Sequence, residues 1–142
     1  MLKIIYITLF FCFSSQSLFA IEYFLTLRND KVNLRQGPSF EYPIKLFYKK
    51  KFLPVLIQDK SDNFRKIRDH ENNTGWIHIS QLSKKKAAIT IDDDQLIFKK
   101  PSIYSKPLAI LKKGRLCKIH KCKDEWCKVS VEKYKGWVKK DI

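Results

Sequence analysis

The residues best suited to chemistry lie together near the C-terminus. After residue 20 the chain holds three cysteines, Cys117, Cys122 and Cys127, with His120 among them. A structural zinc site needs four nitrogen or sulfur ligands, and these four residues nominally supply that number. Their spacing lacks the close pairs of zinc modules, and a Cys/His peptidase needs its nucleophile on a helix or turn, whereas these cysteines lie in a strand-rich segment. We therefore expect neither a metal site nor nucleophilic catalysis here.

Two other groups of polar residues are candidates for catalysis. Asp92, Asp93 and Asp94 are consecutive, and adjacent side chains of an extended chain point to opposite faces, so we interpret this run as a solvated turn. His70 and His78 lack a partner at metal-ligand spacing, and the four glycines are too far apart for a phosphate-binding loop. The sequence therefore predicts a protein without enzymatic activity and without a cofactor.

The first twenty residues have the pattern of a secretory signal peptide. Lys3 supplies a positive start, residues 4–13 are apolar, and Ala20 offers a small residue at a cleavage point. The apolar run is shorter than the roughly 20 residues that span a bilayer, which favours cleavage over a membrane anchor. Leu18, where a small residue is usual, leaves the exact cleavage point open. We expect a periplasmic or secreted protein with no transmembrane segment in the mature chain.

Export would place the cysteines in an oxidising compartment. Four residues separate Cys122 from Cys127, which suits a disulfide across a β-hairpin or its loop. Cys117 then remains unpaired. Because it stands in a strand-like apolar run, we expect it to be a small buried residue with a free thiol.

The remainder of the chain contains an internal repeat. Residues 32–82 and 96–142 can be aligned with a period of about 60 residues, and both segments carry a Gly-Trp pair near their end, at Trp76 and Trp137. This alignment uses a one-residue gap and places Lys99 opposite Arg35. Because solenoid repeats are usually shorter, we interpret the period as a duplicated domain.

Both repeats show the pattern of short strands. Alternating apolar residues are bounded by turn signals, for example at residues 36–39, 59–63 and 72–75. No segment after the signal peptide carries a helical apolar stripe. The pattern predicts an all-β fold of two small barrels. We expect a signal peptide at residues 1–20 and domains at residues 21–84 and 85–142, joined by a lysine-rich linker.

The first repeat resembles the bacterial SH3 (SH3b) family. That family opens on Asn-aliphatic-Arg-x-Gly-Pro-Ser and closes on Gly-Trp-aliphatic, which correspond here to Asn33, Leu34, Arg35, Gly37, Pro38 and Ser39, and to Gly75, Trp76 and Ile77. The second repeat is degenerate: it keeps Pro101-Ser102 and Gly136-Trp137 but has Ile97 for Asn33. The resemblance implies two tandem SH3-like barrels that act as binding modules facing the cell wall.

Four residues of the first repeat are candidates for ligand binding. Arg35 could direct its guanidinium at a carboxylate, either of a wall peptide or of the protein's own loops. Tyr42 and Tyr48 would add an aromatic surface, unless they face the core. Trp76 should mainly cover one end of the barrel, although a partly exposed indole would form one wall of a groove.

The charge of the chain favours anionic partners. The net charge is +15, and 24 of the 29 basic residues are Lys. Residues 21–84 carry 12 basic and 7 acidic side chains and residues 85–142 carry 16 and 7, giving net charges of +5 and +9. Such a field attracts polyanions, but export and the scarcity of Arg argue against specific nucleic-acid recognition.

The favoured partner is therefore peptidoglycan or another component of the cell envelope. One alternative is a periplasmic adaptor that docks a partner protein or peptide. A less favoured one is a basic surface that binds nucleic acid or anionic lipid. The sequence does not indicate an oligomeric state.

Overall fold

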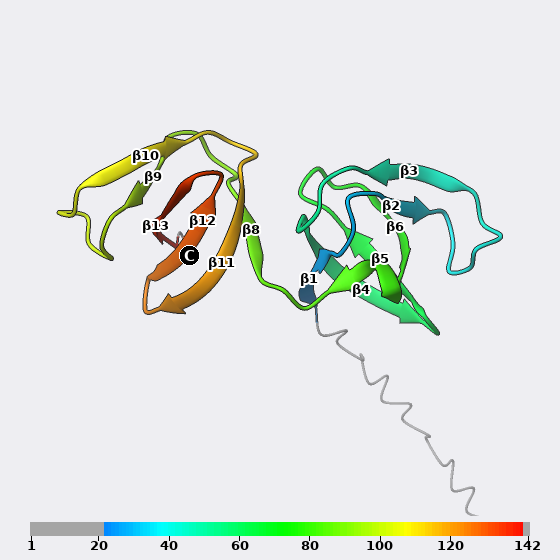
Figure 1. Ribbon diagram of the computed structural model, residues 1–142. Helices are drawn as coiled ribbons and strands as arrows, with labels where there is room; N and C mark the ends of the chain where they lie inside the picture. Colours follow the sequence, from blue (N-terminus) through cyan, green and yellow to red (C-terminus); the bar gives the residue numbers. More distant parts are fainter. Residues whose placement is uncertain (1–21, 141–142) are drawn as a thin grey trace, which may run out of the picture.

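The computed structural model describes residues 22–140, so the predicted signal peptide lies outside the described residues. The described chain forms 13 strands and one short 3-10 helix, arranged in two sheets, which confirms the all-β prediction. Figure 1 shows the two sheets side by side, joined by the segment that runs into β8 (Ala87–Ile89). Within residues 22–140 there is no helix of the length and apolarity needed to cross a membrane.

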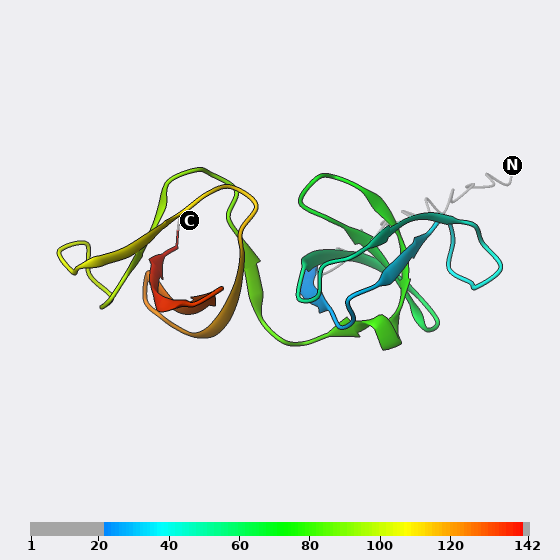
Figure 2. The same cartoon turned by 45° about the horizontal axis from the view of Figure 1, so that its top comes forward.

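The first sheet contains seven antiparallel strands in the order β3-β2-β6-β5-β4-β1-β7. Their bounds are β1 (Tyr23–Leu27), β2 (Val32–Arg35), β3 (Ile44–Tyr48), β4 (Pro54–Ser61), β5 (Phe64–Arg68), β6 (Thr74–His78) and β7 (Leu82–Ser83), with the helix η1 (Ile79–Gln81) before β7. The strands curl around a common core (Figure 2). Because β3 and β7 each pair with only one neighbour among the described strands, the sheet is an open SH3-like curl and not a closed barrel.

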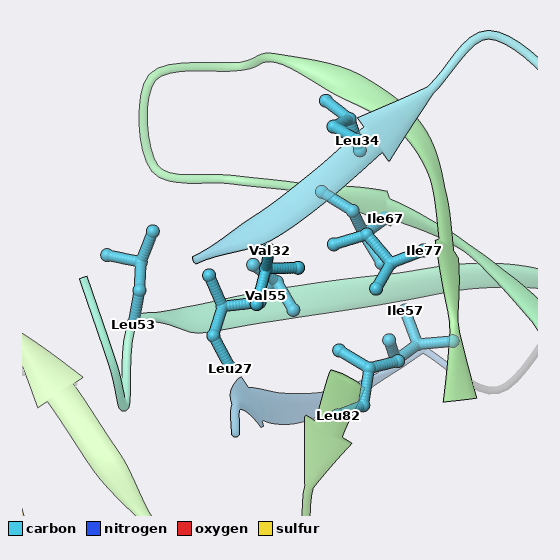
Figure 3. Packing of buried hydrophobic residues seen from close by; sticks show 9 residues of the cluster. All are labelled: Leu27, Val32, Leu34, Leu53, Val55, Ile57, Ile67, Ile77 and Leu82. Atoms are coloured by element: carbon cyan, nitrogen blue, oxygen red, sulfur yellow. The ribbon is translucent and has the colours of Figure 1, made fainter. Parts of the chain in front are cut away.

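Strand alternation places the core of the first sheet. On β2, Val32 and Leu34 are fully buried, whereas Asn33 and Arg35 lie on the opposite face and are only partly covered. Figure 3 shows the nine core residues, which come from every strand of the sheet except β3 and from the segment just before β4: Leu27, Val32, Leu34, Leu53, Val55, Ile57, Ile67, Ile77 and Leu82. Removing each such side chain from water contributes about 1.5–3 kcal/mol to stability.

The hairpin between β4 and β5 turns more tightly than the sequence predicted. The turn expected at residues 59–63 narrows to Asp62 and Asn63, because Lys60 and Ser61 still pair with β5. Asp62 has a φ of 45°, a left-handed conformation that Asp tolerates better than most residues. Polar residues at 59–61 therefore lie in a solvent-facing strand end and not in a loop.

The second sheet repeats this topology with six strands in the order β10-β9-β13-β12-β11-β8. The bounds of the strands after β8 are β9 (Gln95–Phe98), β10 (Pro107–Leu111), β11 (Leu116–Lys123), β12 (Trp126–Val131) and β13 (Tyr134–Lys139). Its core consists of Ile97, Leu111, Cys117, Cys127, Val129 and Val131. Within the described residues no strand corresponds to β7, whose Leu82 helps to fill the first core.

The strand register corrects the sequence alignment of the two repeats. Arg35 pairs with Trp76, and the residue paired with Trp137 is Phe98, so Phe98 and not Lys99 holds the place of Arg35. It follows that Ile97 corresponds to the buried Leu34 and not to Asn33. The gap is unnecessary because residues 36–43 and 99–106 form loops of equal length. Each loop is closed by one backbone bond, Gln36 N to Pro43 O at 3.0 Å and Lys99 N to Lys106 O at 2.9 Å.

The cysteines lie as the sequence predicted. Cys122 on β11 pairs with Cys127 on β12, and a disulfide joins them. Cys117 is a free, buried cysteine on the inner face of β11. Burial raises the pKa of its thiol.

Candidate functional site

Arg35 and Trp76 meet on the outer face of the first sheet. They are paired across β2 and β6, while their neighbours Leu34, Gly75 and Ile77 are buried on the inner face. A Cβ on Gly75 would lie 2.7 Å from the carbonyl oxygen of Arg35, so only glycine lets the two strands approach this closely. The indole of Trp76 is partly exposed beside Arg35.

The guanidinium of Arg35 holds the loop of residues 36–43. Its Nη1 donates to the carbonyl oxygens of Phe40 at 3.0 Å and Tyr42 at 2.9 Å. The guanidinium also lies 5.4 Å from the centre of the Phe40 ring. Among the described residues Arg35 forms no salt bridge, so its protein partners are two carbonyl groups and not the loop carboxylate that was considered.

The loop brings Phe40 onto an aromatic cluster that the sequence analysis missed. The ring centre of Phe40 lies 5.2 Å from that of Phe64 on β5 and 5.0 Å from that of His78 on β6. Phe64 and His78 are themselves 5.1 Å apart. We call these three residues the Phe40 cluster. Only strand pairing reveals it, since the pairing partners Phe64 and His78 are separated by a whole hairpin.

Exposure within the Phe40 cluster is uneven. Phe64 is 6% exposed and forms the floor, whereas Phe40 is 62% exposed and presents its ring to solvent. A large aromatic ring that is both exposed and held in place can stack against a sugar ring or an apolar side chain at little cost in conformational entropy. This arrangement makes Phe40 the most prominent candidate contact of the first domain.

The two predicted tyrosines have different environments. Tyr42 is 48% exposed, and its ring lies over Gly37, where a Cβ would approach the ring atoms to 2.5 Å. Tyr42 thus packs within the loop of residues 36–43, to which Phe40 also belongs. Tyr48 packs against the core instead, and its hydroxyl donates to Oδ2 of the buried Asp69 at 3.0 Å. Burial, with the negative charge of Asp69, raises the pKa of Tyr48.

The second domain lacks this constellation. Phe98, in the place of Arg35, packs edge-on against Trp126 with ring centres 5.6 Å apart. Trp137 instead has the ammonium groups of Lys121 and Lys128 at 5.7 and 5.9 Å from its ring centre. In Figures 1 and 2 the loop after β2 (cyan) and the loop after β9 (yellow) lie at opposite ends of the molecule. The two domains therefore present different surfaces on one scaffold.

The acidic run between the repeats has structural partners. Asp94 forms an ion pair of 2.7 Å with Lys112, and Oδ1 of Asp93 accepts a hydrogen bond of 2.9 Å from the backbone of Lys113. Within residues 22–140, no group of three or more His, Cys, Asp and Glu side chains is placed to hold a metal ion.

Comparison with known proteins identifies the domain type twice. The family model of the bacterial SH3 domain matches residues 28–84 and again residues 92–141. None of the curated proteins matches the chain. Two solved structures from Trichomonas vaginalis, NlpC2 and NlpC1, are each 14% identical to it, with TM-scores of 0.40 and 0.39. They cover 87% and 93% of this chain, which in turn spans only 48% and 49% of theirs.

Proposed function

We propose a function for this chain, which belongs to the bacterial SH3 domain family. It is an exported, non-catalytic protein that binds peptidoglycan or another component of the cell envelope. The proposal rests mainly on one observation. Arg35 holds the loop of residues 36–43 so that the ring of Phe40 is exposed, on the same outer face as the indole of Trp76. The first domain is therefore the expected binding domain.

The chemistry of this face suits a wall polymer. Peptidoglycan combines sugar rings, which stack on aromatic side chains, with short peptides that carry carboxylates. Phe40 and the partly exposed Trp76 offer rings. Arg35 uses Nη1 for the loop, and its planar group carries further N–H donors. The net charges of +5 on residues 21–84 and +9 on residues 85–142 add a general attraction for anionic polymers.

The non-catalytic part of the proposal is supported by how the reactive groups are used. Cys122 and Cys127 form a disulfide, Cys117 is buried, and Asp93 and Asp94 bind Lys113 and Lys112. In these contacts the cysteines and the two aspartates have structural roles. The disulfide also fits an oxidising compartment, which supports export.

A pull-down with insoluble peptidoglycan tests the proposal. The chain without residues 1–20 should pellet with the polymer, and Phe40→Ala should weaken binding by about tenfold, equivalent to 1.4 kcal/mol. Ile103→Ala is the matched control, because Ile103 has the corresponding position in the second domain and is 59% exposed. We expect it to bind like the wild type.

Salt dependence separates contact with the Phe40 cluster from general charge attraction. Binding through aromatic stacking should persist at high ionic strength, whereas purely electrostatic binding should vanish as salt screens the charges. If the wild-type protein stays in the supernatant at every salt concentration, the proposal of wall binding is wrong. The favoured function is then that of an adaptor that docks an envelope protein.

A further inference from the structure

A second feature of the surface is a group of lysines around Phe52, which shares no residue with the Phe40 cluster. The ammonium groups of Lys51, Lys85 and Lys118 lie 5.5, 5.6 and 5.6 Å from the centre of the Phe52 ring. These lysines come from the connection before β4, from the segment between the domains, and from β11 of the second domain. Phe52 thus marks the place where the two domains meet.

A cavity of about 280 Å³ opens beside this ring. We call it the junction pocket, and it is lined by Arg28, Lys51, Phe52, Ser83 and Lys85. Three of its five residues are cationic and none is acidic. Like charges repel one another when they are gathered at one cavity, and a bound anion would relieve that repulsion.

Among the residues that the structure describes, the cations of the junction pocket have no anionic partner. Within the described part of the chain, ion pairs of up to 4.0 Å involve other residues, such as Arg115 with Glu132. Nor do the side chains of Arg28, Lys51 and Lys85 donate a hydrogen bond to any residue between 22 and 140. The neighbouring Lys50, which precedes Lys51, differs because its Nζ donates a hydrogen bond to the carbonyl oxygen of Gly114 at 3.0 Å.

The backbone that carries these cations is held in place. Arg28 N donates to Gln81 O at 2.9 Å, and Phe52 N donates to Leu27 O at 2.9 Å. Thr26 Oγ1 donates to Lys85 O at 2.8 Å. Phe52 also has a φ of 65°, an uncommon conformation for a bulky residue, which orders the chain at the cost of some backbone strain. The protein's own hydrogen bonds therefore hold the backbone around the pocket.

We propose that the junction pocket binds a phosphate group of an anionic ligand. Arg28 can donate two parallel N–H bonds to phosphate oxygens, and Lys51 and Lys85 add compact point charges. Ser83 Oγ accepts a hydrogen bond from Lys85 N at 3.2 Å, so its O–H is available to donate to the ligand. This site is separate from the Phe40 cluster, and the proposal holds whether or not that cluster binds peptidoglycan.

The test is an NMR titration of the chain without residues 1–20 with inorganic phosphate at constant ionic strength. We expect amide shifts concentrated at residues 28, 51–53 and 83–85. The triple variant R28Q/K51Q/K85Q should bind phosphate at least tenfold more weakly. All three side chains are exposed, so the variant should keep the fold, which its own spectrum verifies.

A matched variant separates a site from a general positive field. K60Q/K99Q/K106Q removes the same charge from three exposed lysines outside the pocket and should retain phosphate affinity within about twofold. Equal weakening in both triple variants, or shifts spread over all lysines, would overturn the proposal.

Vesicles then identify the source of the phosphate. The ligand is a lipid headgroup if phosphatidylglycerol vesicles bind the control variant K60Q/K99Q/K106Q but not the pocket variant R28Q/K51Q/K85Q, and phosphatidylcholine vesicles bind neither. If both variants behave alike on vesicles while only the control binds inorganic phosphate, the ligand is a soluble phosphate or phosphate ester.

Discussion

Arg35 on β2 lies directly across from Trp76 on β6, and Phe98 lies across from Trp137 at the same place in the second sheet. This difference is one of those that separate the surfaces of the two domains. With arginine, the loop of residues 36–43 is bonded to the sheet through its carbonyl groups. With phenylalanine, the same position packs against Trp126.

Replacing the arginine tests its hold on the loop. Arg35→Met should keep the aliphatic stem but lose both hydrogen bonds, lowering the free energy of unfolding by about 1–2 kcal/mol. Hydrogen exchange at residues 36–43 should become faster, as followed by mass spectrometry. Arg68→Met is the control, because the Arg68 side chain has no hydrogen-bond or ion-pair partner within residues 22–140. Unchanged exchange in Arg35→Met would contradict this role.

Gly75 should be intolerant of a side chain. A Cβ there would lie 2.7 Å from both Arg35 O and Leu34 Cγ, so Gly75→Ala must separate β2 from β6. We expect a loss of about 1–3 kcal/mol in urea unfolding. At Gly114, where φ is 79° and an added Cβ would meet no atom within 4 Å, Gly114→Asn should change stability by less than about 1 kcal/mol. Similar losses in both variants would show that close approach is not the cause.

Tyr48 should make stability depend on pH above 10. The pKa of Tyr48 is raised in the folded protein from its ordinary value of 10.0, chiefly by burial and then by Asp69. The unfolded state therefore loses its proton first, and the stabilisation present below pH 10 declines as the pH rises towards the folded pKa. Urea unfolding at pH 9 and pH 11 should show the wild type losing about 1 kcal/mol more than Tyr48→Phe, a value reduced for partial solvent screening. Parallel losses in the two proteins would contradict the assignment.

The three cysteines of residues 21–142 should show one free thiol. Because Cys117 is buried and its thiol pKa is raised, the native protein should react slowly with a thiol reagent. Denaturation without reductant should release one reactive thiol, and denaturation with reductant three. Reduction of the disulfide between Cys122 and Cys127 should lower the free energy of unfolding of the second domain by about 2 kcal/mol. Three thiols before reduction would refute the disulfide.

Local sequence patterns were sufficient for the type of the elements, although not for the ends of β4 and β5. Alternation of apolar and polar residues indicated the strands, and Val32 and Leu34 are buried on β2 as that pattern requires. The spacing of Cys122 and Cys127 predicted a hairpin disulfide, which is present. The Gly-Trp pairs predicted a duplicated domain, and the second sheet repeats the strand order of the first. Each of these features depends on neighbouring residues or on a motif of a few positions.

The candidate sites required the tertiary structure. Phe40, Phe64 and His78 come together only because β5 pairs with β6 in one register and the loop of residues 36–43 folds back over them. The ligand roles of Arg35, Tyr42 and Trp76 stay predictions, while Tyr48 packs against the core. Arg28, Lys51 and Lys85 likewise meet from three distant segments. Sequence alternation determines which face a side chain occupies, but the neighbours on that face are determined by long-range strand pairing, which leaves no local signal.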